Sequence, residues 1–311
     1  MNYDLAIIGG GPAAVAAGVY ASRKRLKTVL ITESFGGQSV VSDGIENWIG
    51  TTKISGADLA KSLENHLRAY AGDIVDIKEG ERAEKTEAIE GGFRVTTQKG
   101  AAFEAKTVLV ATGSQRRQLK AIGADIFEHK GLTYCASCDG PLFADQDVAV
   151  IGGGNAGFES AAQLAAYCKS VTIIHKNAEF KADPVTVAKV LANPKVKPVL
   201  NADILEVKGD KFVTGLVYKS NIAGADTTPA TLAVTGIFVE IGAFPSTDFV
   251  KDVLDRNSFG AVVTDPRTQK TSRPGIWAAG DCTDALYHQN NIAAGDAVKA
   301  LEDIYLYIHA K

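Results

Sequence analysis

The chain has 311 residues, a formal net charge of −3, 46% hydrophobic residues and 22% charged residues. One hydrophobic core rarely organises a chain of this length, so we expect two domains. The slightly acidic balance gives no electrostatic reason to bind nucleic acid or an anionic membrane, and we expect neither as a partner.

The N-terminus and the hydropathy pattern predict a cytoplasmic protein. Residues 1–4 lead straight into an apolar run and glycines, without the basic segment or cleavage site of a secretory signal. No apolar stretch approaches the roughly 20 residues that span a bilayer. Four cysteines in so long a chain do not indicate a disulfide scaffold.

A repeated motif predicts the fold. Residues 5–14 (LAIIGGGPAA) recur as residues 148–157 (VAVIGGGNAG). Each copy begins with an apolar run typical of a strand buried on both faces of a parallel sheet. A glycine-rich turn, a stretch of helical period and a second strand follow, at 28–31 in the first copy and 170–174 in the second. The sequence therefore predicts two βαβ units of the same plan.

The two turns are fingerprints for dinucleotide binding. The first reads G-x-G-x-x-A and ends at Ala14, and the second reads G-x-G-x-x-G and ends at Gly157. Their glycines allow a tight turn, close approach of the backbone to a pyrophosphate, and close packing of helix on strand. The N-terminus of the helix supplies N–H groups for the phosphates. Glu33, at the end of the second strand, matches the acid that hydrogen-bonds a ribose; the alternative is a solvated surface glutamate.

The remaining strands divide the chain into two domains. Strand-like segments follow each copy at 92–97, 102–105 and 107–111, then at 202–207, 212–218 and 236–242, and another strand is expected at 275–281. A stretch of helical period at 291–308 closes the chain. We predict an α/β protein with two Rossmann-like, three-layer domains. Residues 1–114 and 245–311 form the first, and residues 115–244 form a second that is inserted into it.

Cys135 and Cys138 form a C-x-x-C pair with three interpretations: half of a zinc site, an inert buried pair, or a redox dithiol. The other two cysteines are single and the five histidines are scattered without ligand spacing, so no metal site is expected. The pair lies shortly before the second fingerprint, which favours redox chemistry. Asp139 could act as a general acid for a departing thiolate, or form the turn before Gly140.

These motifs together resemble the low-molecular-weight thioredoxin reductases, and still more the flavoprotein subunit of alkyl hydroperoxide reductase. The resemblance covers essentially the whole chain. It rests on the two fingerprints and on GGQ at 36–38, EN at 46–47, ATG at 111–113, CASCDG at 135–140 and AGDC at 279–282.

The resemblance implies that the first domain holds FAD and the second holds NADPH or NADH. In the first domain it implies cofactor contacts at Gly9, Gly11, Pro12, Ala13, Glu33, Gly36, Gly37, Gln38, Asn47, Ala111, Thr112, Gly113, Gly280, Asp281, His288 and Gln289. In the second domain the expected contacts are Gly152, Gly154, Asn155, Gly157, His175, Lys176 and Lys181. It also implies that Cys138 accepts electrons from the flavin and that Cys135 attacks the disulfide of a partner.

The expected partner is a thioredoxin- or glutaredoxin-like dithiol protein, or an adaptor of this kind that feeds a peroxiredoxin. The chain begins at the FAD fingerprint, so we expect the acceptor to be a separate protein. The resemblance further implies a homodimer. Because the dithiol and the nicotinamide share a domain, we expect this domain to rotate about linkers near Gly113-Ser114 and Ala243-Phe244.

Two questions stay open from the sequence. An NADH site would carry an acid after the strand that ends near His175, whereas Lys176 and Lys181 favour the 2′-phosphate of NADPH. The lysines could equally form a solvated loop without specificity. The alternative function is a flavin dithiol oxidase, or a reductase with another electron donor. Cys168 and Cys282 are expected to take no part in the chemistry.

Overall fold

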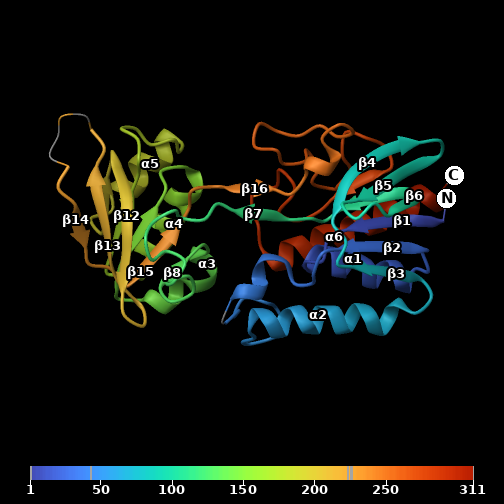
Figure 1. Ribbon diagram of the computed structural model, residues 1–311, viewed down its shortest axis with the longest axis horizontal. Helices are drawn as coiled ribbons and strands as arrows, with labels where there is room; N and C mark the ends of the chain where they lie inside the picture. The colour runs from blue at the N-terminus through green and yellow to red at the C-terminus, as the bar shows by residue number, and fades with distance from the viewer. Residues whose placement is uncertain (1, 43, 223, 225–226, 311) are drawn as a thin grey trace. The chain divides into compact units, whose positions relative to one another are not determined.

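The computed structural model describes residues 2–42, 44–222, 224 and 227–310. It consists of two compact units (Figure 1): unit 1 combines Met1–Gln115 with Phe244–Lys311, and unit 2 is Arg116–Ala243. The predicted fold class, with one α/β domain inserted into another, is confirmed. The predicted domain ends were 114 and 244, and residues 1 and 311 of the first predicted domain lie outside the described residues. Among the described residues, no helix is long and apolar enough to cross a bilayer.

Unit 1 is built on a sheet in the order β3-β2-β1-β6-β5-β4, with β17 also paired to β6. Its elements are β1 (Tyr3–Ile8), α1 (Pro12–Arg23), β2 (Thr28–Thr32), the 3₁₀-helix η1 (Gly37–Val41), α2 (Gly56–Ala71), β3 (Val75–Glu79), β4 (Ala83–Ile89), β5 (Gly92–Thr97), β6 (Ala102–Val110), the 3₁₀-helix η3 (Asp248–Val250), β17 (Ile276–Ala278) and α6 (Asn290–His309).

The two faces of β1 belong to different cores, as the period of a strand requires. Leu5 and Ile7 pack with α1, α2 and α6 on one face of the sheet. Ala6 and Ile8 pack on the other face with residues of β5 and η3. Figure 1 shows α1 and α2 lying along β1, β2 and β3. The four residues are at most 2% exposed, so the apolar run of the first fingerprint is a strand buried on both faces.

Unit 2 is built on the parallel sheet β11-β10-β9-β15-β8, covered by helices on one face and by the sheet β12-β13-β14 on the other. Its elements are β8 (Leu132–Thr133), α3 (Ala136–Asp139), the 3₁₀-helix η2 (Gly140–Phe143), β9 (Asp147–Ile151), α4 (Asn155–Ala165), β10 (Ser170–Ile174), α5 (Pro184–Leu191), β11 (Val196–Val199), β12 (Ala202–Gly209), β13 (Val213–Ser220), β14 (Ala230–Leu232) and β15 (Gly236–Val239). β15 ends at Val239, three residues before the strand end expected at 242, which places Glu240 in the loop that follows.

Two short strands, β7 (Ser114–Arg116) and β16 (Ala243–Pro245), form the connections of the chain between the units and pair with each other. On the side of unit 2 the N–H of Arg117 donates to the carbonyl of Gly242 at 3.0 Å. On the side of unit 1 the N–H of Ser246 donates to the carbonyl of Gly113 at 2.9 Å.

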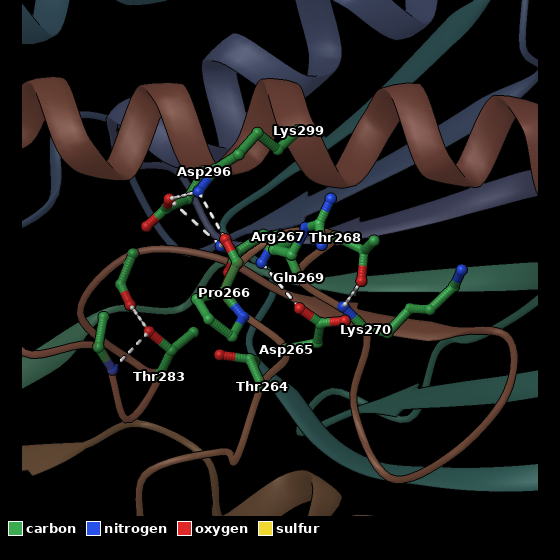
Figure 2. A network of polar contacts seen from close by, with 12 residues as sticks. Thr264, Asp265, Pro266, Arg267, Thr268, Gln269, Lys270, Thr283, Asp296 and Lys299 are labelled. Carbon is green, nitrogen blue, oxygen red and sulfur yellow. Dashed lines mark hydrogen bonds and ion pairs between the residues drawn. The ribbon is translucent and has the colours of Figure 1, made fainter.

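A buried polar network fixes α6 against the loop that precedes β17 (Figure 2). Asp296 of α6 is 6% exposed and accepts from the amide of Gln269 at 3.3 Å and from Lys299 at 2.8 Å. Lys299 also donates to the carbonyl of Pro266 at 3.0 Å. Because a buried carboxylate is costly without such partners, the network fixes where α6 begins, next to the end of β17.

Candidate functional site

In unit 1 the predicted cofactor segments meet at one edge of the sheet. β6 pairs in parallel with both β1 and β17, so the carboxyl ends of the three strands are neighbours. The segments that follow these ends are 9–11, 111–113 and 279–281, which are widely separated in sequence. Crevices outside the carboxyl ends of parallel strands are where such folds bind ligands.

The fingerprint of unit 1 leaves bare backbone where a pyrophosphate would lie. A Cβ on Gly9 would stand 2.1 Å from the carbonyl oxygen of Ala111, so this position has no room for a side chain. Gly11 and Gly37 face each other, and a Cβ on Gly37 would stand 3.4 Å from the Cα of Gly11. Among the described residues, no side chain caps α1, which begins at Pro12 directly after Gly11. These residues therefore fit a dinucleotide at the start of the helix.

Polar side chains from distant segments converge near this edge. The amide nitrogen of Gln38 donates to the hydroxyl of Ser114 at 3.0 Å and to the carboxylate of Asp281 at 3.4 Å. The amide nitrogen of Asn47 donates to the side-chain oxygen of Gln289 at 3.1 Å. The sequence marked Ser114 only as part of a linker between the domains, because no motif indicates a partner 76 residues from Gln38.

The other predicted residues of unit 1 occupy distinct positions. Glu33 is exposed directly after β2, and its carboxylate lies 3.8 Å from Arg82. The Thr112 hydroxyl donates to the carbonyl of Ser246 at 2.7 Å. His288 is exposed, next to Gln289. A Cβ on Gly280 would stand 3.5 Å from the Cβ of Ala13, so the segment after β17 lies against the start of α1. Gly36 precedes η1, Ala111 and Gly113 follow β6, and Pro12 and Ala13 open α1.

The fingerprint of unit 2 also has the geometry of a phosphate cradle. A Cβ on Gly157 would stand 2.2 Å from the carbonyl oxygen of Gly152, so helix and strand pack more closely than any side chain allows. A Cβ on Gly154, by contrast, would meet no heavy atom of the described chain within 4 Å. Asn155 begins α4, and its side-chain oxygen accepts from the N–H of Asp183 at 2.8 Å. The start of α4 is thus open for a phosphate, whereas the third glycine is a packing position.

The segment after β10 combines a buried imidazole with exposed ammonium groups. His175 is 8% exposed and stacks on Phe180 with 5.8 Å between ring centroids, and burial lowers its pKa. The backbone N–H of Lys181 donates to the carbonyl of Gly153 at 2.7 Å, which holds this segment against the turn. Lys176 and Lys181 are exposed, and in the described part of the chain neither ammonium pairs with a carboxylate. They are available to a phosphate.

Cys135 and Cys138 are joined by a disulfide at the start of α3, with 5.3 Å between their Cα atoms. Both residues are partly buried. The Sγ of Cys135 accepts from the N–H of Cys138 at 3.1 Å. After reduction, the same N–H would favour the thiolate form of Cys135, which is the form that attacks a disulfide.

Two side chains support this dithiol. The Thr133 hydroxyl donates to the carboxylate of Asp139 and accepts from the N–H of Cys135 at 3.3 Å, so it connects the nucleophile's backbone to the expected acid. Gln163 of α4 accepts from the Ser137 hydroxyl at 3.0 Å. The helix that begins at the second fingerprint therefore also anchors the dithiol. Neither Thr133 nor Gln163 belongs to a motif that the sequence could identify.

The remaining cysteines are chemically different from the pair. Cys168 and Cys282 are free thiols with no measurable exposure, and burial raises the pKa of each to about 11. Thiols of this kind are inert, because the thiolate is the reactive species. Among the described residues, no group of three His, Cys, Asp or Glu side chains is arranged to hold a metal ion.

Comparisons with known proteins agree with the resemblance drawn from the motifs. Residues 3–298 match the pyridine nucleotide-disulphide oxidoreductase family. The chain is 40% identical over 308 residues to the F subunit of alkyl hydroperoxide reductase from Escherichia coli, and 37% identical over 306 residues to a protein of Bacillus subtilis named NADH dehydrogenase. Each match covers 98% of this chain, which spans only 58% of either relative. The crystal structure of thioredoxin reductase from Streptococcus pyogenes is 33% identical, with a TM-score of 0.90 and complete coverage of both chains.

Proposed function

The chain belongs to the pyridine nucleotide-disulphide oxidoreductase family and is of the thioredoxin reductase type, and from this premise we propose that it is an FAD-dependent NAD(P)H:disulfide reductase. Its physiological substrate is the disulfide of a partner of the thioredoxin or glutaredoxin fold. The observation that carries the proposal is the Cys135–Cys138 disulfide, which lies beside Asp139 in the unit that bears the second fingerprint.

The chain's own residues carry out the exchange with the partner. FAD in unit 1 would supply the route by which a hydride from the nicotinamide becomes an electron pair on the Cys135–Cys138 disulfide. The Cys135 thiolate then attacks one sulfur of the partner's disulfide, forms a mixed disulfide and releases a partner thiolate, which takes a proton from Asp139. Cys138 then gives its proton to the Asp139 carboxylate and attacks the sulfur of Cys135 in the mixed disulfide, which re-forms the internal disulfide. The second partner sulfur leaves as a thiolate and takes a proton from solvent.

The unpaired ammonium groups of Lys176 and Lys181 support NADPH as the electron donor, because a 2′-phosphate would lie after β10. NADH is the second candidate, favoured by the name of the Bacillus subtilis relative. Anaerobic mixing of the purified yellow protein with each dinucleotide distinguishes them. Rapid bleaching of the flavin by one identifies the donor. Bleaching by neither contradicts the proposal and favours an oxidase or another electron donor.

The two half-reactions require unit 2 to move. The second fingerprint and the dithiol lie in one unit, and both must serve the same flavin, so we propose that unit 2 rotates about β7 and β16. A chemical cross-link between the units should leave one half-reaction intact and stop turnover; turnover at the original rate would contradict rotation. We further propose that the protein is cytoplasmic and forms a homodimer, and sedimentation of the purified protein tests the dimer. When the partner is an adaptor, we propose a peroxiredoxin as the final acceptor.

A further inference from the structure

Glu240 is the first residue after β15, and its backbone is packed against the second fingerprint. Its N–H donates to the carbonyl of Ile151 at 2.7 Å. Its own carbonyl oxygen lies so close to Gly152 that a Cβ there would stand 2.0 Å away. The backbone of Glu240 therefore fixes the turn, and its side chain starts from a defined position at the edge of the sheet.

The side chain of Glu240 is a partly buried carboxylate tied to the fingerprint helix. Its Oε1 accepts from the hydroxyl of Ser160 on α4 at 2.7 Å. Among the elements packed against it, the charged groups that act on this carboxylate are Arg116 of β7 and Glu159 of α4. Burial is the largest influence and raises the pKa of Glu240 to about 6, Glu159 adds to the rise, and Ser160 and Arg116 oppose it.

The order of the strands places this carboxylate at one end of a bound dinucleotide. β9 lies between β10 and β15 in the sheet. In such a βαβ unit the adenosine ribose of a bound dinucleotide would lie near the end of the second strand, beside His175 and Lys176, and the pyrophosphate would lie over the turn after β9. The other half of the dinucleotide must therefore extend past β9 to the end of β15, where Glu240 stands.

We propose that Glu240, held by Ser160, positions the nicotinamide-ribose half of the dinucleotide and takes up a proton when the dinucleotide binds. This inference rests on the proposed function, because it assumes a pyridine nucleotide at the second fingerprint. The bound dinucleotide excludes water and brings two phosphate charges, and both effects disfavour an ionised carboxylate. The protonated carboxyl becomes a hydrogen-bond donor to an oxygen of the nicotinamide ribose or carboxamide.

The test is calorimetric titration of the purified holoprotein with NAD⁺ and with NADP⁺, between about pH 5.5 and about pH 8, in buffers of different ionisation enthalpy. A coupling of about one pKa unit makes binding nearly tenfold tighter at about pH 5.5 than at about pH 8, with proton uptake greatest near about pH 6.5, between the pKa values of the free and the bound protein. Glu240→Gln, a permanently uncharged analogue, should bind at about pH 8 as the wild type binds at about pH 5.5. Its proton uptake should be lost.

Three controls make the result specific. Glu206→Gln removes an exposed carboxylate of β12 in the same unit and should leave the pH dependence unchanged. Adenosine 5′-diphosphate brings phosphate charges but lacks the nicotinamide half, so the wild type should bind it with a clearly weaker pH dependence than it binds the dinucleotides. Ser160→Ala removes the hydrogen bond that favours the ionised form, so it should move the pH dependence to higher pH. It serves as the second variant if Glu240→Gln does not fold.

The outcomes separate the inference from the function on which it rests. If the wild type binds a dinucleotide and Glu240→Gln keeps the same pH dependence and proton uptake, the role of Glu240 is overturned and the proposed function stands. If neither dinucleotide binds to the wild type at any pH, the nicotinamide site is overturned together with the role of Glu240.

Discussion

The two fingerprints begin with the same GGG turn and differ in what surrounds it. In unit 1 the third position is Ala14, which is fully buried and fits between helix and strand. In unit 2 it is Gly157, where a methyl group would stand 2.2 Å from a carbonyl oxygen. After the second strand, unit 1 presents the exposed carboxylate of Glu33, whereas unit 2 presents a buried His175 and the exposed Lys176. The same backbone plan thus carries opposite charges after the second strand of each βαβ unit, where a ribose would lie in a bound dinucleotide.

The residues that surround the two turns also come from different parts of the chain. Gly11 faces Gly37, and the side chains near the turn of unit 1 come from segments as distant as Asp281. The turn of unit 2 is contacted by Glu240, directly after β15, and by Lys181 of the segment after β10. Ser160 of the turn's own helix holds the Glu240 side chain, and the same helix anchors the dithiol. We infer that unit 1 retains its cofactor, since several separate segments would have to part to release it. In the proposed reaction, unit 2 would take up and release a dinucleotide between cycles of the dithiol.

The largest expected effect concerns the chemistry that only unit 2 carries. Cys135→Ser and Cys138→Ser should each lower disulfide reduction by more than about a thousandfold, because each removes a group that makes or breaks a bond. Cys135→Ser should keep reduction of the flavin by the nicotinamide. Steady-state reduction of a partner disulfide and anaerobic flavin bleaching measure the two steps separately.

The matched control for these variants is Cys168→Ala in the same unit. Cys168 is fully buried with a raised pKa, so the change should leave both steps within about twofold of the wild type. Full disulfide reduction by Cys135→Ser would show that the second unit's chemistry does not depend on this dithiol.

The next prediction distinguishes two roles of the glycines in the second fingerprint: Gly157 allows close packing, whereas Gly154 leaves space for a bound dinucleotide. Gly157→Ala should destabilise unit 2 by about 3 kcal/mol, since its methyl group would meet backbone that cannot move aside. Gly154→Ala should cost less than about 1 kcal/mol, because the added methyl group enters open space. It should nevertheless weaken dinucleotide binding, because that space is where the pyrophosphate would lie. Urea unfolding and dinucleotide titration measure the two quantities, and equal losses of stability would contradict the distinction.

In the comparison of the two fingerprints, the sequence predicted the features that depend on the pattern of neighbouring residues. The apolar runs, the glycine turns and Cys135–Cys138 were recognisable because their meaning depends on neighbouring residues. The bond between Gln38 and Ser114 was not recognisable, because it depends on how β6 places distant loops at one edge. The same holds for Thr133, which lies just outside the C-x-x-C motif. The sequence did not single out Glu240, because this residue was expected inside a strand. In the structure β15 ends at Val239, the residue directly before it.

A smaller effect concerns the charge at the ribose position of unit 2. Changing Lys176 and Lys181 together to alanine should weaken NADP⁺ binding by roughly tenfold to a hundredfold, because a phosphate would lose two charged partners. NAD⁺ binding should change by less than about twofold. Lys208→Ala on β12 is the control, since this lysine is exposed in the same unit and remote in the sheet order. Equal losses for both dinucleotides would show that the lysines form a solvated loop without specificity.

The smallest effect concerns the stability of unit 2 and its dependence on pH. Burial raises the pKa of Glu240 from 4.5 to about 6 in the folded chain, so the folded state holds this proton longer than the unfolded state does. The ionised carboxylate therefore destabilises the fold, and this penalty appears as the pH rises from 4.5 to about 6. At higher pH it is constant and at most about 2 kcal/mol.

Glu240→Gln should relieve this penalty, with no gain in unfolding free energy below pH 4.5 and the full gain above about pH 6.5. Urea unfolding across this range measures the difference, and a gain that is the same at every pH would mean that packing, not ionisation, distinguishes the two side chains. Glu33→Gln in unit 1 is the control, because it removes an exposed carboxylate and should not reproduce a gain that depends on burial. A pH-dependent gain confined to Glu240→Gln would show that the buried position of this carboxylate, and not the loss of one negative charge, causes the penalty.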